Sequence, residues 1–275
     1  MLHRAKDLTG FKLRSTDGEA GTIKDLYFDD DKWTIRYFVV DTGGWLSGRL
    51  VLISPHAVTG ADWAGEALLV NLTQQQIENS PGIDTAKPVS RQHETAIADY
   101  YGHPYHWTGP YLWGVSAYPA MTAGSGVQDP GTPGAMPATA ATDAAVAAEQ
   151  EESGPQLRTY AEVVGYDIQA MDDTVGHVED FLVDDRDWSI QLIVIDTRNW
   201  LPGKDVLISP KRIVKVGWLD KNVTVKATRD EVEGSPEYDA EMLTTESGVR
   251  ELYRQTGDRT TVTGGRTDRN PGYQR

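Results

Sequence analysis

The chain has 275 residues, enough for one or two domains, and its hydrophobic fraction of 39% is low for a single compact body. Its 41 acidic and 26 basic side chains give a formal net charge of −15, which repels phosphate backbones and disfavours nucleic acid as a partner. The absence of cysteine excludes disulfides, thiolate zinc sites, iron–sulfur clusters and cysteine nucleophiles. The N-terminal stretch is polar and no run of about 18 apolar residues occurs, so we expect a soluble, cytoplasmic protein without a membrane span.

An internal repeat decides the expected architecture. Residues 10–55 align without a gap with residues 165–210, an offset of 155, and the similarity continues to residues 84 and 239. Roughly a third of the aligned positions are identical. Such self-similarity indicates a duplicated structural unit.

Each copy has the pattern of short β-strands. In residues 33–40, WTIRYFVV, every second side chain is large and apolar, and residues 188–195, WSIQLIVI, repeat that face. The acidic runs DDDKW and DDRDW just before these strands are typical of hairpin turns. Short strands at this close spacing predict an all-β fold with a small β-barrel in each copy.

Short helices are predicted after the last strand of each copy. Thr73 with Gln76, and Thr228 with Glu231, have the spacing of a capping box, in which each side chain satisfies a backbone N–H of the other residue. A Ser-Pro pair ends both helices. A further short helix is predicted within residues 240–256.

The motif WLxGxxVLISP occurs at residues 45–55 and again at 200–210, and a G-x-I/V-x-D pattern precedes the first hairpin of each copy. With these motifs, the chain resembles the PRC-barrel family over both repeats. That family includes the cytoplasmic domain of the photosynthetic reaction-centre H subunit and the C-terminal domain of the ribosome-maturation factor. The resemblance implies two tandem barrels used for docking and assembly, with no catalytic residue to carry over.

Acidic turns and histidines are the remaining candidates for chemistry. The turns at Asp29 and Asp184 lack the glycine and the closing glutamate of an EF-hand, and we interpret them as turn formers. His103 and His106 are separated by a proline, which argues against a helix that presents both to one metal ion. No nucleophile or nucleotide-binding motif is present. We therefore expect no enzyme activity, no catalytic residue, no metal and no cofactor.

The stretch YYGHPYHWTGPYLWGVSAY, residues 100–118, has no counterpart in the second copy. Because so many aromatic rings would expose too large an apolar patch, the stretch must be buried against something. Three arrangements would bury it. The stretch wraps one of its own barrels or fills the groove between them, it forms a homodimer interface, or it contacts a foreign protein, pigment or peptide. The candidate interaction residues are Tyr100, Tyr101, Tyr105, Trp107, Tyr111 and Trp113, together with Trp45 and Trp200 of the repeated motif.

The predicted organisation follows from these patterns. It comprises a first barrel at residues 1–94, an aromatic strap at 95–119, a flexible linker rich in Ala, Gly, Pro and Thr at 120–156, a second barrel at 157–240, and a short helix with a disordered tail at 241–275.

The duplication of loops without the duplication of any reactive group predicts a non-enzymatic interaction or assembly protein with two docking barrels. One alternative is an accessory protein of a photosynthetic or other membrane electron-transfer complex, with peripheral membrane association. Another is a ribosome- or RNA-associated factor, which the net charge disfavours. The sequence does not identify the protein partner, and homo-oligomerisation stays open.

Overall fold

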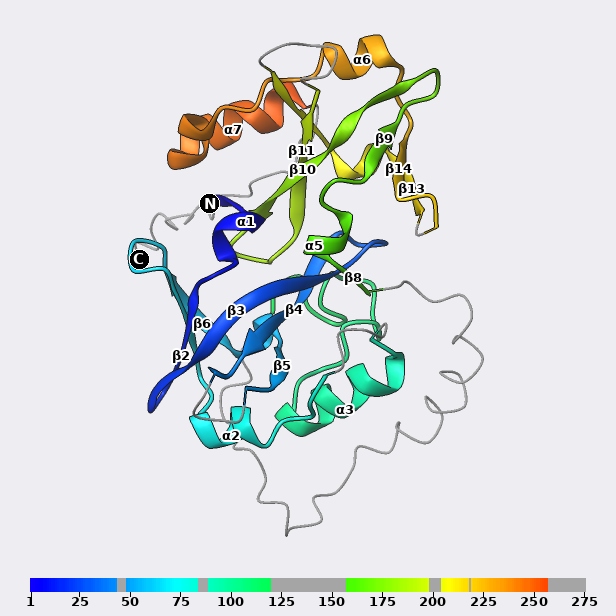
Figure 1. The fold of residues 1–275 in the computed structure, drawn as a ribbon. Helices are drawn as coiled ribbons and strands as arrows, with labels where there is room; N and C mark the ends of the chain where they lie inside the picture. The colour runs from blue at the N-terminus through cyan, green and yellow to red at the C-terminus, as the bar shows by residue number, and fades with distance from the viewer. Residues whose placement is uncertain (44–47, 84–88, 120–156, 198–203, 218, 257–275) are drawn as a thin grey trace, which may run out of the picture.

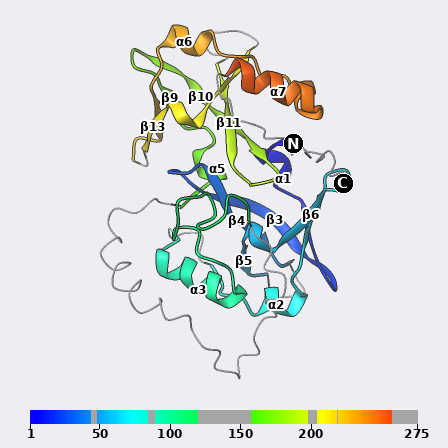
Figure 2. The ribbon, with the colours of Figure 1, turned by 180° about the vertical axis from the view of Figure 1, so that it is seen from behind.

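The computed structural model describes the chain except residues 44–47, 84–88, 120–156, 198–203, 218 and 257–275. Figure 1 shows the first copy of the repeat below and the second copy above, and Figure 2 shows the same arrangement from behind. The predicted linker and the predicted tail beyond residue 256 lie outside the described residues.

Each copy supplies six strands of a seven-stranded sheet, and the two sheets have the same strand order. The first sheet runs β5-β4-β3-β2-β7-β6, with β8 also pairing with β3, and the second runs β12-β11-β10-β9-β14-β13, with β1 pairing with β10. The pairs β2–β7 and β9–β14 are parallel and the other neighbours are antiparallel.

The strands of the first sheet are β2 (Lys12–Ser15), β3 (Gly18–Asp29), β4 (Thr34–Asp41), β5 (Leu50–Ile53), β6 (Val58–Asp62), β7 (Ala67–Val70) and β8 (Leu157–Thr159). Those of the second are β1 (Leu2–Arg4), β9 (Asp167–Gln169), β10 (Thr174–Asp184), β11 (Ile190–Asp196), β12 (Asp205–Ile208), β13 (Ile213–Gly217) and β14 (Asn222–Val225). The helices are α1 (Ala5–Leu8), η2 (Pro55–Ala57), α2 (Gln74–Glu78), α3 (Arg91–Tyr101), α5 (Tyr160–Val163), η3 (Pro210–Arg212), α6 (Arg229–Glu233), η4 (Ala240–Thr244) and α7 (Glu246–Gln255).

Neither sheet closes into a barrel through the ladders of the described strands, which corrects the prediction of two closed barrels. The path of the first sheet ends at β5 and β6, and that of the second at β12 and β13. The outer edge of β5 is occupied by the chain that follows α2, where Val51 forms a bridge with Gly82. Val206 and Glu237 form the equivalent bridge on β12. Because a strand has only two edges, this segment takes the place that β6 would need for closure.

The two copies exchange their first strands. β1 belongs to the first copy in sequence but pairs with β10 of the second sheet, where Leu2 lies opposite Asp184. β8 pairs with β3 of the first sheet, where Leu157 lies opposite Asp29. Both pairs of equivalent positions are 155 residues apart, so the exchange is reciprocal. The predicted domain boundaries stay a prediction, but each sheet includes a strand from the other copy.

The two sheets meet at their acidic hairpin turns. The N–H of Ile35 donates to the carbonyl of Trp188 at 2.8 Å, and the N–H of Ile190 donates to the carbonyl of Trp33 at 2.6 Å. Trp33 and Trp188 both have a positive φ, of 47° and 61°, which is uncommon for a bulky residue. These matched contacts indicate an approximate two-fold relation between the copies.

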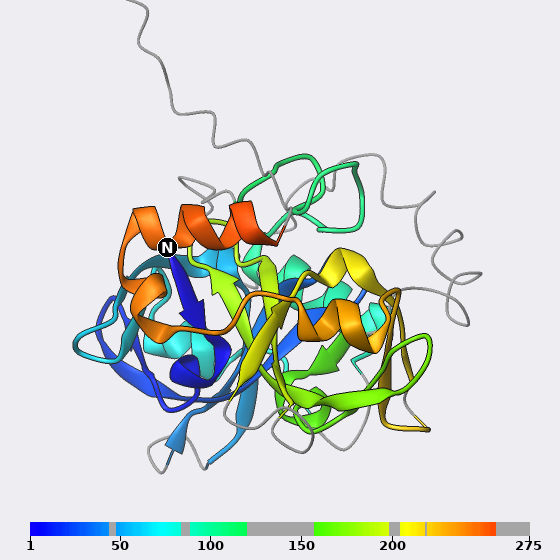
Figure 3. The same cartoon turned by 90° about the horizontal axis from the view of Figure 1, so that it is seen from above.

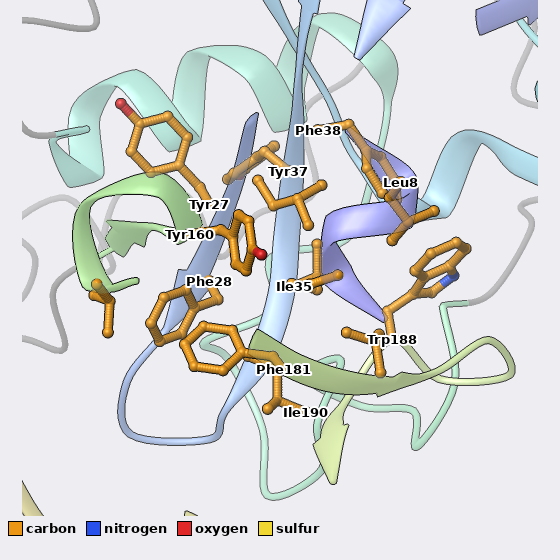
Figure 4. Packing of buried hydrophobic residues seen from close by; sticks show 14 of the residues in the cluster. Leu8, Tyr27, Phe28, Ile35, Tyr37, Phe38, Tyr160, Phe181, Trp188 and Ile190 are labelled. Carbon is orange, nitrogen blue, oxygen red and sulfur yellow. The ribbon is translucent and has the colours of Figure 1, made fainter. Parts of the chain in front are cut away.

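A hydrophobic cluster crosses this junction (Figure 4). Phe181 of the second copy lies edge-on to Phe28 of the first, with 5.2 Å between the ring centroids. Trp188 lies edge-on to Phe38 at 5.0 Å. All four side chains are buried, so separating the copies would return large apolar surfaces to water. The copies therefore form one packed unit, a point that the sequence left open.

Both predicted capping boxes are present. Thr73 accepts the N–H of Gln76, whose side chain accepts the N–H of Thr73 at the start of α2. Thr228 and Glu231 make the same reciprocal bonds at the start of α6. The single large apolar residue of each helix is fully buried, so the cap and one side chain fix each helix to its sheet.

The duplication extends beyond the aligned sequence. α3 begins at residue 91 and α7 at residue 246, again 155 apart, and the hydroxyl of the preceding residue caps each helix. Figure 2 shows α3 beside the first sheet, and Figure 3 shows α7 on the outer side of the second. α7 confirms the helix predicted within residues 240–256. The sequence pattern does not predict α3, because its buried face includes the charged residue Glu94.

Candidate interaction site

The aromatic segment, residues 100–118, begins in the last turn of α3. Gly102 ends that helix with a left-handed φ of 68°, which glycine adopts without steric cost. Tyr101 is 4% exposed and belongs to the core. Tyr100 is partly buried, and its hydroxyl donates to the carbonyl of Gln76 at 2.8 Å. Both tyrosines therefore hold α3 to the first copy.

Tyr105 and Trp107 fold back against α3. Their rings stack with 4.8 Å between the centroids. The guanidinium of Arg91 lies 4.2 Å from the centroid of the Trp107 ring, and the Tyr105 hydroxyl donates to the carboxylate of Asp99 at 2.6 Å. Both rings are partly buried. These contacts fix the first half of the segment to the helix from which it emerges.

Trp113 is 1% exposed and connects the two copies. Its indole N–H donates to the carbonyl of Asp187 in the second copy at 2.9 Å. The ring centroid lies 4.9 Å from the guanidinium of Arg36 and 4.9 Å from the centroid of the His56 ring, which it meets edge-on. We call the space formed by Arg36, His56 and Asp187 the Trp113 socket. At Trp113, the segment therefore fills a groove between the two copies of the repeat.

A tight reversal of the chain presents Trp113 to its socket. Tyr111 forms a bridge with Gly114, and Trp113 forms a bridge with Ser116. Gly114 has a φ of 77°, and a Cβ at this position would lie 2.5 Å from the carbonyl oxygen of Tyr105. Only glycine avoids both the strain and this overlap. The reversal is therefore closely packed.

A fully buried ion pair contacts the backbone of the segment. Arg36 is 0% exposed and donates to the carboxylate of Asp29 at 2.9 Å. A second guanidinium N–H donates to the carbonyl of Leu112 at 2.6 Å. Burial alone raises the pKa of Asp29, but the charge and the hydrogen bond of Arg36 bring that pKa below its usual value. Asp29 therefore stays ionised, and Arg36 links the ion pair to the backbone of the segment.

A second buried contact joins the segment to α3. The Nε2 atom of His106 lies 2.7 Å from an oxygen of Glu94, and Arg91 lies 3.0 Å from the other oxygen. Burial raises the pKa of Glu94 to about 7, although the charges of Arg91 and Arg36 oppose the shift. Burial and the charge of Arg36 hold the pKa of His106 well below its usual value. Near neutral pH the contact therefore pairs a neutral imidazole with a carboxyl group close to its midpoint.

His103, the other histidine of the segment, is a packing group in this fold. His103 lies 5.2 Å from His56, ring to ring, and burial lowers the pKa of His103 to about 3. Within the described ranges, the group of three whose metal-ligating atoms come within 4.8 Å of one another is His177, Glu179 and Asp196, on β10 and β11. The sequence does not single out that group.

Three large hydrophobic side chains of the segment face solvent. Tyr111 is 55% exposed, Val115 is 73% exposed and Tyr118 is 57% exposed. Leu112, beside them, borders a hollow of about 840 Å³. Of the predicted interaction residues of the segment, Tyr111 is therefore exposed and Trp113 is buried, with the others tied to α3. Trp45 and Trp200 lie outside the described residues.

Sequence reasoning missed Arg36 and Glu94, which anchor the segment. The signal that could have found Arg36 is its equivalent in the second copy, Gln191, since a charge present in one copy and absent from the other suggests a partner specific to that copy. The segment is likewise specific to the first copy. Glu94 carries no comparable signal, because the alignment ends before it.

A family model for the PRC-barrel domain matches residues 1–76 and 155–232, which is more than half of the chain. The chain belongs to the PRC-barrel domain family. A search among curated proteins gave no match. The matched regions contain the exchanged strands and end within α2 and α6, so α3, the aromatic segment and α7 lie beyond them. None of the helices in the described part of the chain has the length and apolar character to cross a membrane.

Proposed function

We propose that this chain is a non-enzymatic interaction protein that docks a protein partner on the exposed side of the aromatic segment. The observation that carries the proposal is the concentration of exposed apolar side chains there. Among the described residues, Tyr111, Val115 and Tyr118 are three of seven large hydrophobic side chains that are exposed, and they lie within eight positions. Clustered exposure of this kind marks interaction surfaces.

The anchoring of the segment supports docking. Trp113, Arg36 and Leu112 fix the backbone beneath the exposed side chains, so these need little further ordering when a partner binds. A preorganised surface loses less conformational entropy on association. Tyrosine is also enriched in protein interfaces, because it offers a large ring and a hydrogen-bonding group.

The chemistry of the segment favours contact over catalysis. His106 of the segment is 8% exposed and contacts Glu94 of α3, which is 2% exposed. The large hydrophobic groups that solvent reaches are two phenol rings and a valine. These groups suit the binding of another protein surface, and the net charge of −15 favours such a partner over nucleic acid.

The proposal is tested by changing the exposed side chains and leaving Trp113 in place. A variant with Tyr111→Ser, Val115→Ser and Tyr118→Ser is compared with the wild type as bait for proteins in a native lysate, quantified by mass spectrometry. We expect the captured partner to fall at least tenfold with an unchanged melting temperature. Leu69→Ser with Met171→Ser, at exposed positions elsewhere, is the matched control and should retain the partner.

Two results would contradict the proposal. One is capture of the same partner by the triple variant at the wild-type level. The other is substrate turnover by the purified wild type that the triple variant retains in full. Deleting the whole segment is a poorer test, because it removes the buried Trp113 and a hydrogen-bond acceptor of Arg36.

A further inference from the structure

The Trp113 socket has an equivalent on the second copy. Positions 155 residues beyond Arg36 and His56 are Gln191 and Lys211, and both line the 840 Å³ hollow. The walls of this second socket come from the first acidic turn (residues 30–33), the start of β11 (189–191), and η3 with β13 (209–216). Asp187 of the second acidic turn and Leu112 of the aromatic segment complete the lining. Its volume lies within the range of ligand pockets, about 300–1,000 Å³.

Exposure distinguishes the two sockets. His56 is 3% exposed because α3 and the aromatic segment cover it, whereas its equivalent Lys211 is exposed. On the wall of the second socket, Val214 is 64% exposed. The second copy thus presents to solvent the same framework that, in the first copy, holds a tryptophan.

We propose that the second socket binds a tryptophan side chain on an extended segment of a partner protein, with acidic residues next to that tryptophan. This inference rests on the proposed docking function and adds a second contact point with its own chemistry. The chain itself shows the mode of binding, because Trp113 enters the first socket from a tight reversal and donates its indole N–H to a backbone carbonyl of the opposite copy. Buried tryptophans of this kind dominate the binding energy of many interfaces.

The charges around the second socket specify the flanking residues. Asp30 is paired with Arg158 at 2.6 Å, and the Asp187 carboxylate accepts hydrogen bonds from Ser189. The β13 side of the hollow contributes Lys215, which stands where the first copy has a glycine. Asp31 and Lys32 line the side formed by the acidic turn, where the ammonium of Lys32 donates to the carbonyl of Tyr111 at 3.0 Å. Carboxylates beside the entering tryptophan would complement the ammonium group of Lys215 on the β13 side.

A second copy of this chain fits the socket less well. Its own Trp113 is buried, and the exposed rings of its aromatic segment are Tyr111 and Tyr118. A tyrosine has no indole N–H to reproduce the bond that Trp113 makes. Among the described residues no tryptophan is exposed, which favours a different protein as the source of the tryptophan.

The test uses the full chain and a labelled peptide of residues 109–116 with two glutamates added, which carries the reversal around Trp113. Binding is measured by fluorescence anisotropy. We expect saturable binding to the wild type, at least tenfold weaker binding of the same peptide with Trp113→Ala, and at least tenfold weaker binding to a Val214→Glu variant. The matched control is Thr59→Glu, the equivalent exposed position in the first copy, which should bind as the wild type does.

Other outcomes overturn the proposal. Equal binding of the two peptides, or equal binding to the Val214→Glu and wild-type chains, would show that the socket does not take a tryptophan. A wild-type dimer that Val214→Glu dissociates would make the second copy the occupant. Binding that appears only after residues 257–275 are removed would make that part of the chain the occupant. The partner capture described above is scored separately, so it can succeed while this proposal fails.

Discussion

The two copies share a fold and differ in how their outer faces are covered. In the first copy, α3 meets β4 through polar groups, Tyr37 and the buried Glu94. The equivalent positions in the second copy are Leu192 and Val249, in the apolar cluster between β11 and α7. Because buried polar groups need specific partners, the first copy accepts one particular covering segment. The comparison teaches that the copies diverged at the covering faces while the strand framework stayed the same.

The acidic turns show the same divergence. Asp29 pairs with Arg36, whose side chain is 0% exposed, whereas its equivalent Asp184 pairs with Arg186, whose side chain is 58% exposed. Arg36 lies on β4, within the sheet, whereas Arg186 lies in the hairpin turn itself. A buried pair depends on both partners, while a solvent-exposed arginine can be replaced at little cost.

The largest expected effect comes from removing the side chain that joins the copies. Trp113→Ala should lower the free energy of unfolding by about 3–5 kcal/mol, because it empties a buried site between the two sheets. Urea denaturation measures the change. Tyr111→Ala, at an exposed position two residues earlier, should change stability by only about 0.5 kcal/mol. A loss below about 1 kcal/mol for Trp113→Ala would show that the socket is loosely packed.

The ion pairs allow a direct comparison between the copies. Arg36→Gln installs the residue of the second copy and leaves Asp29 buried without a cation, so we expect a loss of about 3 kcal/mol. Arg186→Gln at the exposed pair should cost less than about 1 kcal/mol. Both variants are compared by denaturant unfolding at neutral pH. Equal losses would contradict the difference in burial.

Glu94 should make stability depend on pH. Its pKa is raised from 4.5 to about 7 in the folded state, so its stabilising contribution is complete below about pH 4.5 and is lost as the pH rises through 7. Relative to a Glu94→Gln variant, the wild type should therefore lose about 2–3 kcal/mol between pH 4.5 and pH 8. Unfolding at a series of pH values measures the difference. A constant difference would show that Glu94 titrates normally.

The smallest effect should be equal in the two copies. Thr73→Ala and Thr228→Ala each remove one capping box, and each should cost about 1 kcal/mol. Thermal melting of the two single variants provides the comparison. Unequal losses of stability would mean that the two copies also differ in their framework, and not only in the segments that cover it.

Much of the framework could be predicted from local patterns. The repeat, the hairpin turns and the capping boxes depend on residues close together in sequence, and all are present in the fold. The prediction of closed barrels was wrong, because the segment that occupies the edge of β5 comes from beyond α2. The exchange of β1 and β8 could not be predicted either, because the sequence pattern of each strand is compatible with both sheets.

The candidate site was predictable only as a stretch of sequence. The density of aromatic residues at 100–118 shows that the stretch needs cover, and composition cannot tell which ring lies inside. Trp113 and Tyr111 are both large and aromatic, yet one is 1% exposed and the other 55%. Their difference arises from the reversal at Gly114 and from Arg36, which contacts the segment from 76 residues earlier in the chain.

The sequence by itself determined the duplication, the β-rich class and the family, because these depend on residue identity and spacing alone. Only the tertiary structure decided that the copies exchange strands, share a core, and hold one tryptophan between them while the equivalent socket faces solvent. The physical reason is that burial is a property of contacts between distant segments. Arg36 and Gln191 therefore occupy equivalent positions in the two copies, yet the surface at Arg36 is covered and the surface at Gln191 is exposed.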